Sequence, residues 1–312
     1  MNTFKGVKLI PGDDKRLVES CLRALAGRNI EVPTTIVDIG QEGANIINRI
    51  IAYMEYDTAQ KNHIVDDLLT SAGQSLLPQK ELSWLQDNER ACFWFWGVIS
   101  KSHFFASPDH PTTQPFRGQQ VSVTTPYKNL KLKSSPASSN ERFEEIIKFF
   151  DRVGQPMEWQ RLLIDELKKR WAYIYNARNP FSWLKQDDAE QCAWAWDYIS
   201  HRNTPVRYDN SPATSEFSPV NLKEKYLSIY AVYDCWETQP DSKKLFCHNF
   251  NKAWHQKKLR DSRQGKKVCN LVLREDVKRK LDQMAHDQNM TLNRMVESLI
   301  ENEYLKQTET PR

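Results

Sequence analysis

The chain has 312 residues, of which 39% are hydrophobic and 27% are charged. This composition is typical of a globular protein and excludes wholesale disorder, and the length suffices for two or three domains. The formal net charge of +4 is too small to identify a binding partner by itself.

The N-terminal residues and the cysteines indicate the compartment. The run MNTFKGVKLIPGDDKR lacks the apolar stretch of a signal peptide, and no uninterrupted apolar run approaches membrane-spanning length. Six cysteines are scattered without a CxxC pair, which suits buried free thiols better than a disulfide framework. We therefore expect a cytoplasmic protein that makes no membrane contact.

An internal repeat follows an N-terminal segment, residues 1–43, in which we identify no chemistry. The run Ser-Trp-Leu at 83–85 recurs at 182–184, and the Trp-x-Trp spacing at 94–96 recurs at 194–196. The simplest interpretation is a helical, Trp-rich module of three helices that occurs in two copies. The copies cover residues 44–103 and 143–201.

The repeated tryptophans and acids each allow more than one interpretation. A helix that starts near Asp187 is apolar on two faces, so its tryptophans most simply belong to a core. The alternatives for the tryptophans are a platform that stacks bases or a ligand, and a protein-binding surface. Asp87 and Asp187 precede the repeated helix, and we interpret them as N-terminal caps rather than catalytic carboxylates.

Polar, Pro-rich connectors over residues 104–142 and 202–220 follow the two copies. Residues 221–265 are expected to form a helical hairpin that ends in a basic segment. From Lys257 to Lys280 there are ten Lys or Arg and three acids, so positive charge is concentrated here. These cations suit the C-terminal end of a helix dipole. We favour phosphate contact instead, because they adjoin residues 266–306.

The apolar period changes within residues 266–306, and residues 307–312 are expected to be a disordered tail. Cys269, Leu271 and Leu273 alternate with Val268, Asn270 and Val272, as in a strand with one buried face. Two stripes with helical spacing follow, and Asn289 separates them. The first stripe comprises Val277, Leu281, Met284 and Ala285, and the second comprises Leu292, Met295, Val296, Leu299 and Ile300.

One strand and two amphipathic helices, about 40 residues together, cannot bury their apolar faces alone. A single strand also has no partner for its backbone groups, so we expect a homodimer. The order of strand, helix, Asn turn and Thr-opened helix resembles the ribbon-helix-helix family of the Arc/MetJ type. The resemblance implies a C-terminal β-α-α domain for dimerisation and DNA binding. Together with the internal repeat, it predicts a mainly α fold in which duplicated three-helix modules precede this domain.

The same resemblance assigns roles to individual residues. The ribbon of two chains would enter the major groove and read bases with Val268, Asn270 and Val272. The dimer core would comprise Cys269, Leu271, Leu273, Val277, Leu281, Met284, Leu292, Met295, Val296 and Leu299. By the resemblance, phosphates would be held by the first turn of the second helix, with Thr291, Asn293 and Arg294. The basic run ahead of the strand adds expected phosphate contacts because it adjoins the strand: Lys257, Lys258, Arg260, Arg263, Lys266 and Lys267. For Thr291 and Arg294, the alternative is a helix cap with a solvated arginine.

Motifs for catalysis and for metal binding are missing from the sequence. No Walker loop, GxGxxG, HExxH or GxSxG motif occurs. Cys235 and the Cys247-His248 pair do not have the spacing of a recurring zinc site. We therefore expect no catalytic site, no metal site and no cofactor.

Together these features predict a bacterial or phage-type homodimer that binds palindromic or inverted-repeat double-stranded DNA. Its role would be transcriptional regulation or nucleoid-associated organisation of DNA, with residues 44–201 available for a protein partner or oligomerisation. The order of helical domain, basic helix and ribbon is also weakly similar to the MatP family. Two alternatives stay open: an antitoxin-like or complex-forming protein whose tail provides autoregulation, and an enzyme with a site between the two modules.

Overall fold

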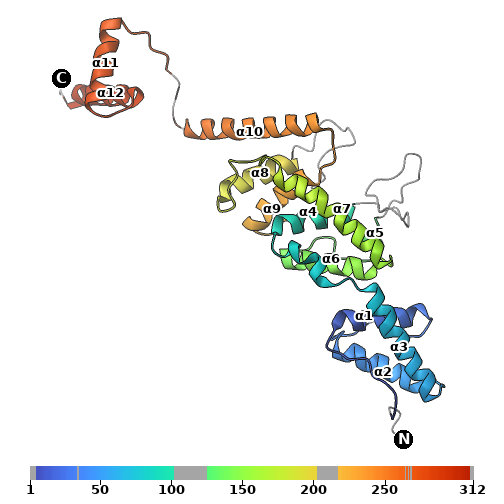
Figure 1. The fold of residues 1–312 in the computed structure, drawn as a ribbon. Helices are drawn as coiled ribbons and strands as arrows, with labels where there is room; N and C mark the ends of the chain where they lie inside the picture. The colour runs from blue at the N-terminus through green and yellow to red at the C-terminus, as the bar shows by residue number, and fades with distance from the viewer. Residues whose placement is uncertain are drawn as a thin grey trace. The chain divides into compact units, whose positions relative to one another are not determined.

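The computed structural model describes residues 5–33, 35–101, 125–201, 217–263, 265, 267 and 269–309. Within these residues the chain forms twelve α-helices, one 3-10 helix and no β-strand (Figure 1). The helices belong to an N-terminal unit, Met1–Asn251, and a C-terminal unit, Lys252–Arg312. None of the described helices is long and apolar enough to cross a membrane.

The N-terminal unit begins with a group of three helices that has its own core. These are α1 (Lys15–Gly27), α2 (Gln41–Tyr53) and α3 (Thr58–Ser75). Asp14 accepts hydrogen bonds from the first turn of α1, and Asp57 and Gln60 form a capping box at the start of α3. Their apolar faces meet in a core built from Val18, Cys21, Leu25, Ile47, Ile51, Val65 and Leu68.

A second core contains the rest of the N-terminal unit and is organised around one helix, α4 (Glu89–Lys101). Every residue of α4 from Ala91 to Ser100 is buried. Because this helix is apolar on all sides, it requires neighbours on all sides. The elements of this core are η1 (Gln79–Leu85), α4, α5 (Pro126–Asn129), α6 (Ser139–Arg152), α7 (Met157–Asn176), α8 (Ala189–His201), α9 (Leu222–Asp234) and the first part of α10 (Pro240–Ser262).

The helices pack in three successive groups, which we call the first, second and third group. The first is α1–α3. In the second group, α4 packs against α6, and Trp94 of α4 lies 5.5 Å from Trp171 of α7, measured between ring centroids. In the third group, α8 packs against α9, and Trp194 stacks on Phe250 of α10 at 5.6 Å. Helices α4 and α8, which end the two predicted modules, are the first α-helices of the second and third groups.

The tryptophans of the repeat lie in or against the core. Trp94 and Trp96 are completely buried, and Trp194 and Trp196 are half-buried. The predicted caps are each displaced by one residue. Asn88 accepts the backbone N–H of Ala91 at 3.0 Å, and Asp188 accepts that of Gln191 at 2.9 Å. Asp87 and Asp187 are not the capping residues, because the helices start later than the acids suggested.

The predicted strand before α11 is wrong. Residues 269–274 are neither helix nor strand, and no described residue offers a neighbouring strand. Alternation of apolar and polar residues is not sufficient for a strand, since its N–H and C=O groups need a second strand to bond. The β-α-α domain of the sequence prediction is therefore corrected to an extended segment followed by two helices.

The predicted connectors and tail overlap the described residues only in part. Residues 102–124 and 202–216 lie outside the description, whereas α5 and the start of α6 lie within the predicted first connector. The predicted hairpin corresponds to α9 and α10. The last helix, α12 (Leu292–Glu309), extends past the predicted domain limit at 306.

Gly97 tests the packing of α4. A Cβ atom there would lie 2.7 Å from the Cys235 sulfur and 2.9 Å from the Phe217 ring. We expect Gly97→Ala to lower the free energy of unfolding, measured by urea titration, by about 1–3 kcal/mol. The control is Gly73→Ala in α3, where an added Cβ meets nothing within 4 Å, and which should raise stability by about 0.5–1 kcal/mol. An unchanged midpoint for Gly97→Ala would contradict this close packing.

Candidate nucleic-acid interface

The C-terminal unit contains two helices that share a very small core. Helix α11 (Glu275–Asp287) ends at a turn in which Asn289 has a left-handed φ of 50°, and α12 follows. Backbone N–H groups of the turn donate to the last carbonyls of α11, an arrangement that ends helices commonly. Among the residues described in this unit, only Leu281, Ala285 and Met295 are buried in the core between the two helices.

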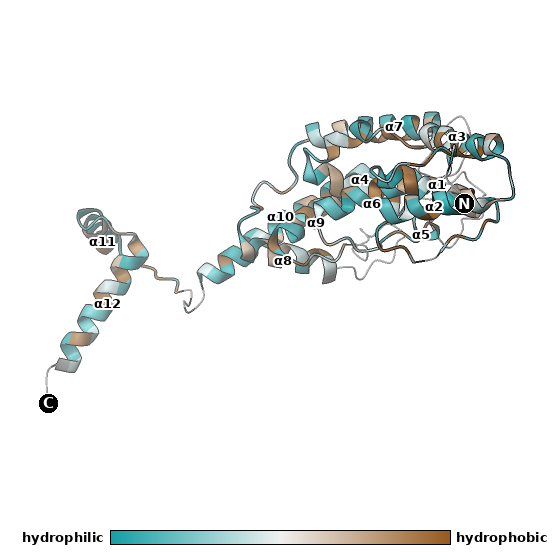
Figure 2. Ribbon diagram, turned by 90° about the horizontal axis from the view of Figure 1, so that it is seen from below, coloured by the Kyte–Doolittle hydropathy of each residue, from teal (hydrophilic) through white to brown (hydrophobic). Residues whose placement is uncertain are grey.

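An apolar groove remains open on this helix pair. It has a volume of about 310 Å³. Leu271 and Ile300, both more than half exposed, lie at its surface. Apolar residues of both helices recur along their length among hydrophilic ones (Figure 2). The groove is lined by Leu271, Leu273, Val277, Lys280, Leu281, Met284, Val296, Leu299 and Ile300.

Most residues of the predicted dimer core line this groove. The exceptions are Met295, which is buried between the helices, and Cys269 and Leu292, which are exposed and do not line it. The predicted dimer core omitted Lys280 and Ile300, although Ile300 follows Leu299 on the same apolar stripe. The seven shared residues are Leu271, Leu273, Val277, Leu281, Met284, Val296 and Leu299.

In the extended segment before α11, alternate side chains line the groove or lie outside it. Leu271 and Leu273 line the groove, whereas Asn270 and Val272 are exposed and do not. Val272 is completely exposed. The side chains expected to contact bases at these two positions are therefore accessible. Val268 and Lys266 lie outside the described residues.

The start of α12 combines a helix cap with exposed polar groups. The Thr291 hydroxyl accepts the backbone N–H of Arg294 at 3.4 Å, so Thr291 caps the helix. Thr291, Asn293 and Arg294 are all exposed. The cap interpretation and the phosphate interpretation are compatible here, because a capped helix start still carries the positive end of the helix dipole.

The basic segment extends from the last turns of α10 to Lys267. Lys258, Arg260, Arg263 and Lys267 are exposed. Lys257 is engaged within the helix, since its ammonium pairs with Asp261 and lies 5.5 Å from the centroid of the Trp254 ring. Four of the predicted phosphate-binding cations of this segment are therefore presented to solvent.

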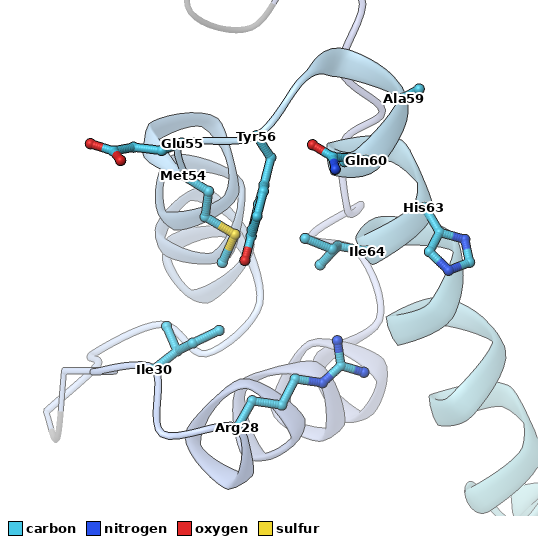
Figure 3. A pocket seen from close by; sticks show the side chains of 9 residues that line it. All are labelled: Arg28, Ile30, Met54, Glu55, Tyr56, Ala59, Gln60, His63 and Ile64. Atoms are coloured by element: carbon cyan, nitrogen blue, oxygen red, sulfur yellow. The ribbon is translucent and has the colours of Figure 1, made fainter.

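The N-terminal unit contains a larger hollow, of about 980 Å³, between the end of α1, the α2–α3 loop and the start of α3. Met54, Tyr56, Ile64 and Arg28 turn towards it, and His63 turns away (Figure 3). Arg28 is held by an ion pair with Asp67. The lining offers no pair of groups arranged for acid–base or nucleophilic chemistry.

Buried charges in the second core serve the packing. The Arg142 guanidinium donates one hydrogen bond to the Glu224 carboxylate, at 3.0 Å, and forms an ion pair with it at 2.8 Å. It also lies 3.7 Å from the centroid of the Phe93 ring. Burial raises the pKa of Glu224, while Arg142 opposes the shift. The pair joins α6 to α9 inside a core rather than in a cleft, so we assign it a structural role. No local sequence pattern indicated this pair, because its partners are far apart in the chain.

Metal ligands are not assembled in the part of the chain that the structure describes: no group of three or more His, Cys, Asp or Glu side chains is placed to hold an ion. Comparison of the chain with protein-family models, with curated proteins and with solved structures gives no match. The site must therefore be argued from its own residues.

The cysteines allow a chemical test of the exposed segment. Cys92 and Cys21 are buried, and burial raises the pKa of Cys92 to about 12 and that of Cys21 to about 11, whereas Cys269 is exposed. Because the thiolate is the reactive form, we expect Ellman's reagent at pH 8 to modify Cys269 first and the two buried thiols only after unfolding. Cys269→Ser should remove the fast phase of the reaction. Persistence of a fast phase of the same amplitude would show that another thiol is the accessible one.

Proposed function

We propose that the chain is a homodimeric DNA-binding protein whose C-terminal unit supplies both the dimer contact and the DNA contact. The observation that carries this proposal is the apolar groove on α11 and α12, in a unit whose remaining surface is rich in exposed cations. The extended segment that contains Asn270 and the capped start of α12 that contains Arg294 belong to the same unit as the groove.

The groove supports dimerisation because the helix pair leaves most of its apolar side chains in water. Leu281, Ala285 and Met295 alone make a core far smaller than an independent domain requires. A second copy would cover the groove with an identical one, which is the self-complementary contact of a two-fold dimer. Lys280 is compatible with this contact because its aliphatic stem can lie along apolar surface while its charge stays in water. The contact uses the helices with Leu271 and Leu273 and requires no paired strand.

The cations support DNA as the ligand. Lys258, Arg260, Arg263 and Lys267 are exposed on one short stretch of chain, and the start of α12 adds the positive end of a helix dipole. Phosphate contacts of this kind position a protein but do not select a sequence. Asn270, whose amide can bond adenine, is the polar side chain of the extended segment that suits base recognition, and Val272 can contact thymine methyl groups.

A two-fold dimer would bind two half-sites, so the preferred DNA should be a palindrome or inverted repeat. Genome-wide mapping of bound sites would separate the two roles that fit this chemistry. A few promoter sites would support transcriptional regulation, and many scattered sites would support organisation of DNA. The absence of bound sites would overturn the proposal.

The dimer contact is tested by charge insertion. We expect Leu299→Glu, in the groove, to make the protein monomeric in sedimentation velocity, because two carboxylates would be buried in the contact. The control is Tyr304→Glu, an exposed aromatic residue of the same helix that does not line the groove. It should leave the dimer intact. A wild-type protein that sediments as a monomer at micromolar concentration would refute the dimer.

The DNA contact is tested by a pair of substitutions with different expected signatures. Arg263→Ala should reduce the slope of log K against log salt by about one and weaken all sequences alike. Asn270→Ala should leave that slope unchanged and flatten the base preference found by binding-site selection. Fluorescence anisotropy over a salt series measures the slopes. An unaltered selected motif for Asn270→Ala would remove this residue from base recognition.

A further inference from the structure

The same ion pair occurs in equivalent places between successive groups of helices. Arg16 is the second residue of α1, and its guanidinium donates to both carboxylate oxygens of Asp151, near the end of α6, at 2.6 and 2.9 Å. Arg90 is the second residue of α4 and donates in the same way to Asp234, at the end of α9, at 2.9 and 3.0 Å. We call the α1–α6 contact the first joint and the α4–α9 contact the second joint.

The helices that receive the arginines also start alike. Ser138 caps α6 by accepting the backbone N–H of Glu141, and Asn221 caps α9 by accepting that of Glu224. The two capping residues, the two glutamates that follow them and the two aspartates of the ion pairs are each the same number of residues apart in the chain. The two joints are therefore repeats of one structure, and they can be compared directly.

Apolar packing accompanies the ion pair in the second joint. Helices α4 and α9 belong to one continuous core. The Cys235 sulfur lies within hydrogen-bonding distance of the Trp94 carbonyl, at 3.4 Å, and Gly97 gives it room. Opening this joint would expose buried side chains such as Ile229 and Phe93 to water, at a large cost in free energy.

Polar contacts connect the first joint. The core of α1–α3 is separate from the core that contains α6. Besides the ion pair, Arg23 donates to the Asp151 carbonyl at 2.8 Å, and Arg152 pairs with Glu19. The Arg16 guanidinium also donates to the Leu77 carbonyl at 2.8 Å. Water can replace hydrogen bonds of this kind when the joint opens, so opening costs far less than in the second joint.

The chain crosses from the first group to the second through a short extended link. Leu76 has φ −83° and ψ 113°, and Pro78 has φ −58° and ψ 124°. Leu76 packs against the first core, whereas Leu77 is buried in the second. The link is thus anchored on both sides, and a change of backbone angles between these two leucines would turn one group against the other.

We propose that the first joint is a hinge, in which α1–α3 moves as a rigid body about Leu76–Pro78 when the ion pairs between α1 and α6 open. The second joint stays closed, because the apolar core spans it. The hinge gives the N-terminal group a closed state held by charges and an open state favoured by high salt, which screens partly exposed ion pairs. Arg152 and Glu19 are such a pair, with side chains 27% and 24% exposed.

The hinge is tested in the full-length chain with a pair of spin labels and matched variants. Labels at Thr70→Cys on α3 and Lys169→Cys on α7, both exposed positions, report the distance across the first joint, in a Cys269→Ser background. We expect a narrow distance distribution at low salt that broadens about twofold at high salt. Asp151→Asn should give the broad distribution at all salt concentrations without lowering the unfolding midpoint of the second core.

The control is Asp234→Asn, the same change in the second joint. It should leave the distance distribution narrow and lower the stability of the core, because it weakens the pairing of Arg90 in a joint that is otherwise apolar. Arg16→Gln repeats the test from the other partner, should Asp151→Asn fail to fold. A narrow distribution in both first-joint variants would overturn the hinge, as would equal broadening by Asp234→Asn.

Discussion

The burial of α4 on all of its sides is the constraint on which most of this structure depends. A helix that carries Trp94 and Trp96 on one stretch and leaves no polar face cannot end a domain. It requires α6 and α7 of its own group and α9 of the next group. The second and third groups are consequently fused into one core, and Gly97 leaves room there for the Cys235 sulfur and the Phe217 ring.

The related helix α8 shows how the array of groups ends. It repeats the cysteine and the tryptophans of α4, but Glu190 and Asp197 stand where α4 has Arg90 and Gly97, and both are exposed. In α8 an acid replaces the arginine that would pair with an aspartate of a following group. A charged side chain replaces the glycine that would leave space for the packing of that group. A polar outer face is what terminal repeats require in order to remain in water. The C-terminal unit differs from this polar outer face, because an apolar groove on its helix pair is open to solvent.

The sequence predicted the elements better than their partners. The Trp-x-Trp repeat identified the two related helices α4 and α8, and apolar stripes identified most of the residues that line the groove, including Leu281, Val296 and Leu299. The error at the predicted strand has a physical cause. The alternation around Leu271 shows that one face is apolar without showing what covers it, and a strand also needs a second strand to bond.

By itself, the sequence determined the helical character of the chain, its internal repeat, the concentration of positive charge after Lys257 and the apolar stripes of α11 and α12. These are local properties, set by residues a few positions apart. Only the tertiary structure decided the three groups, the Arg142–Glu224 pair in the core and the repeated pairs of Arg16 with Asp151 and Arg90 with Asp234. Their partners are 82, 135 and 144 residues apart. Contacts across such separations form only when whole helices pack, and no local pattern encodes which helices those will be.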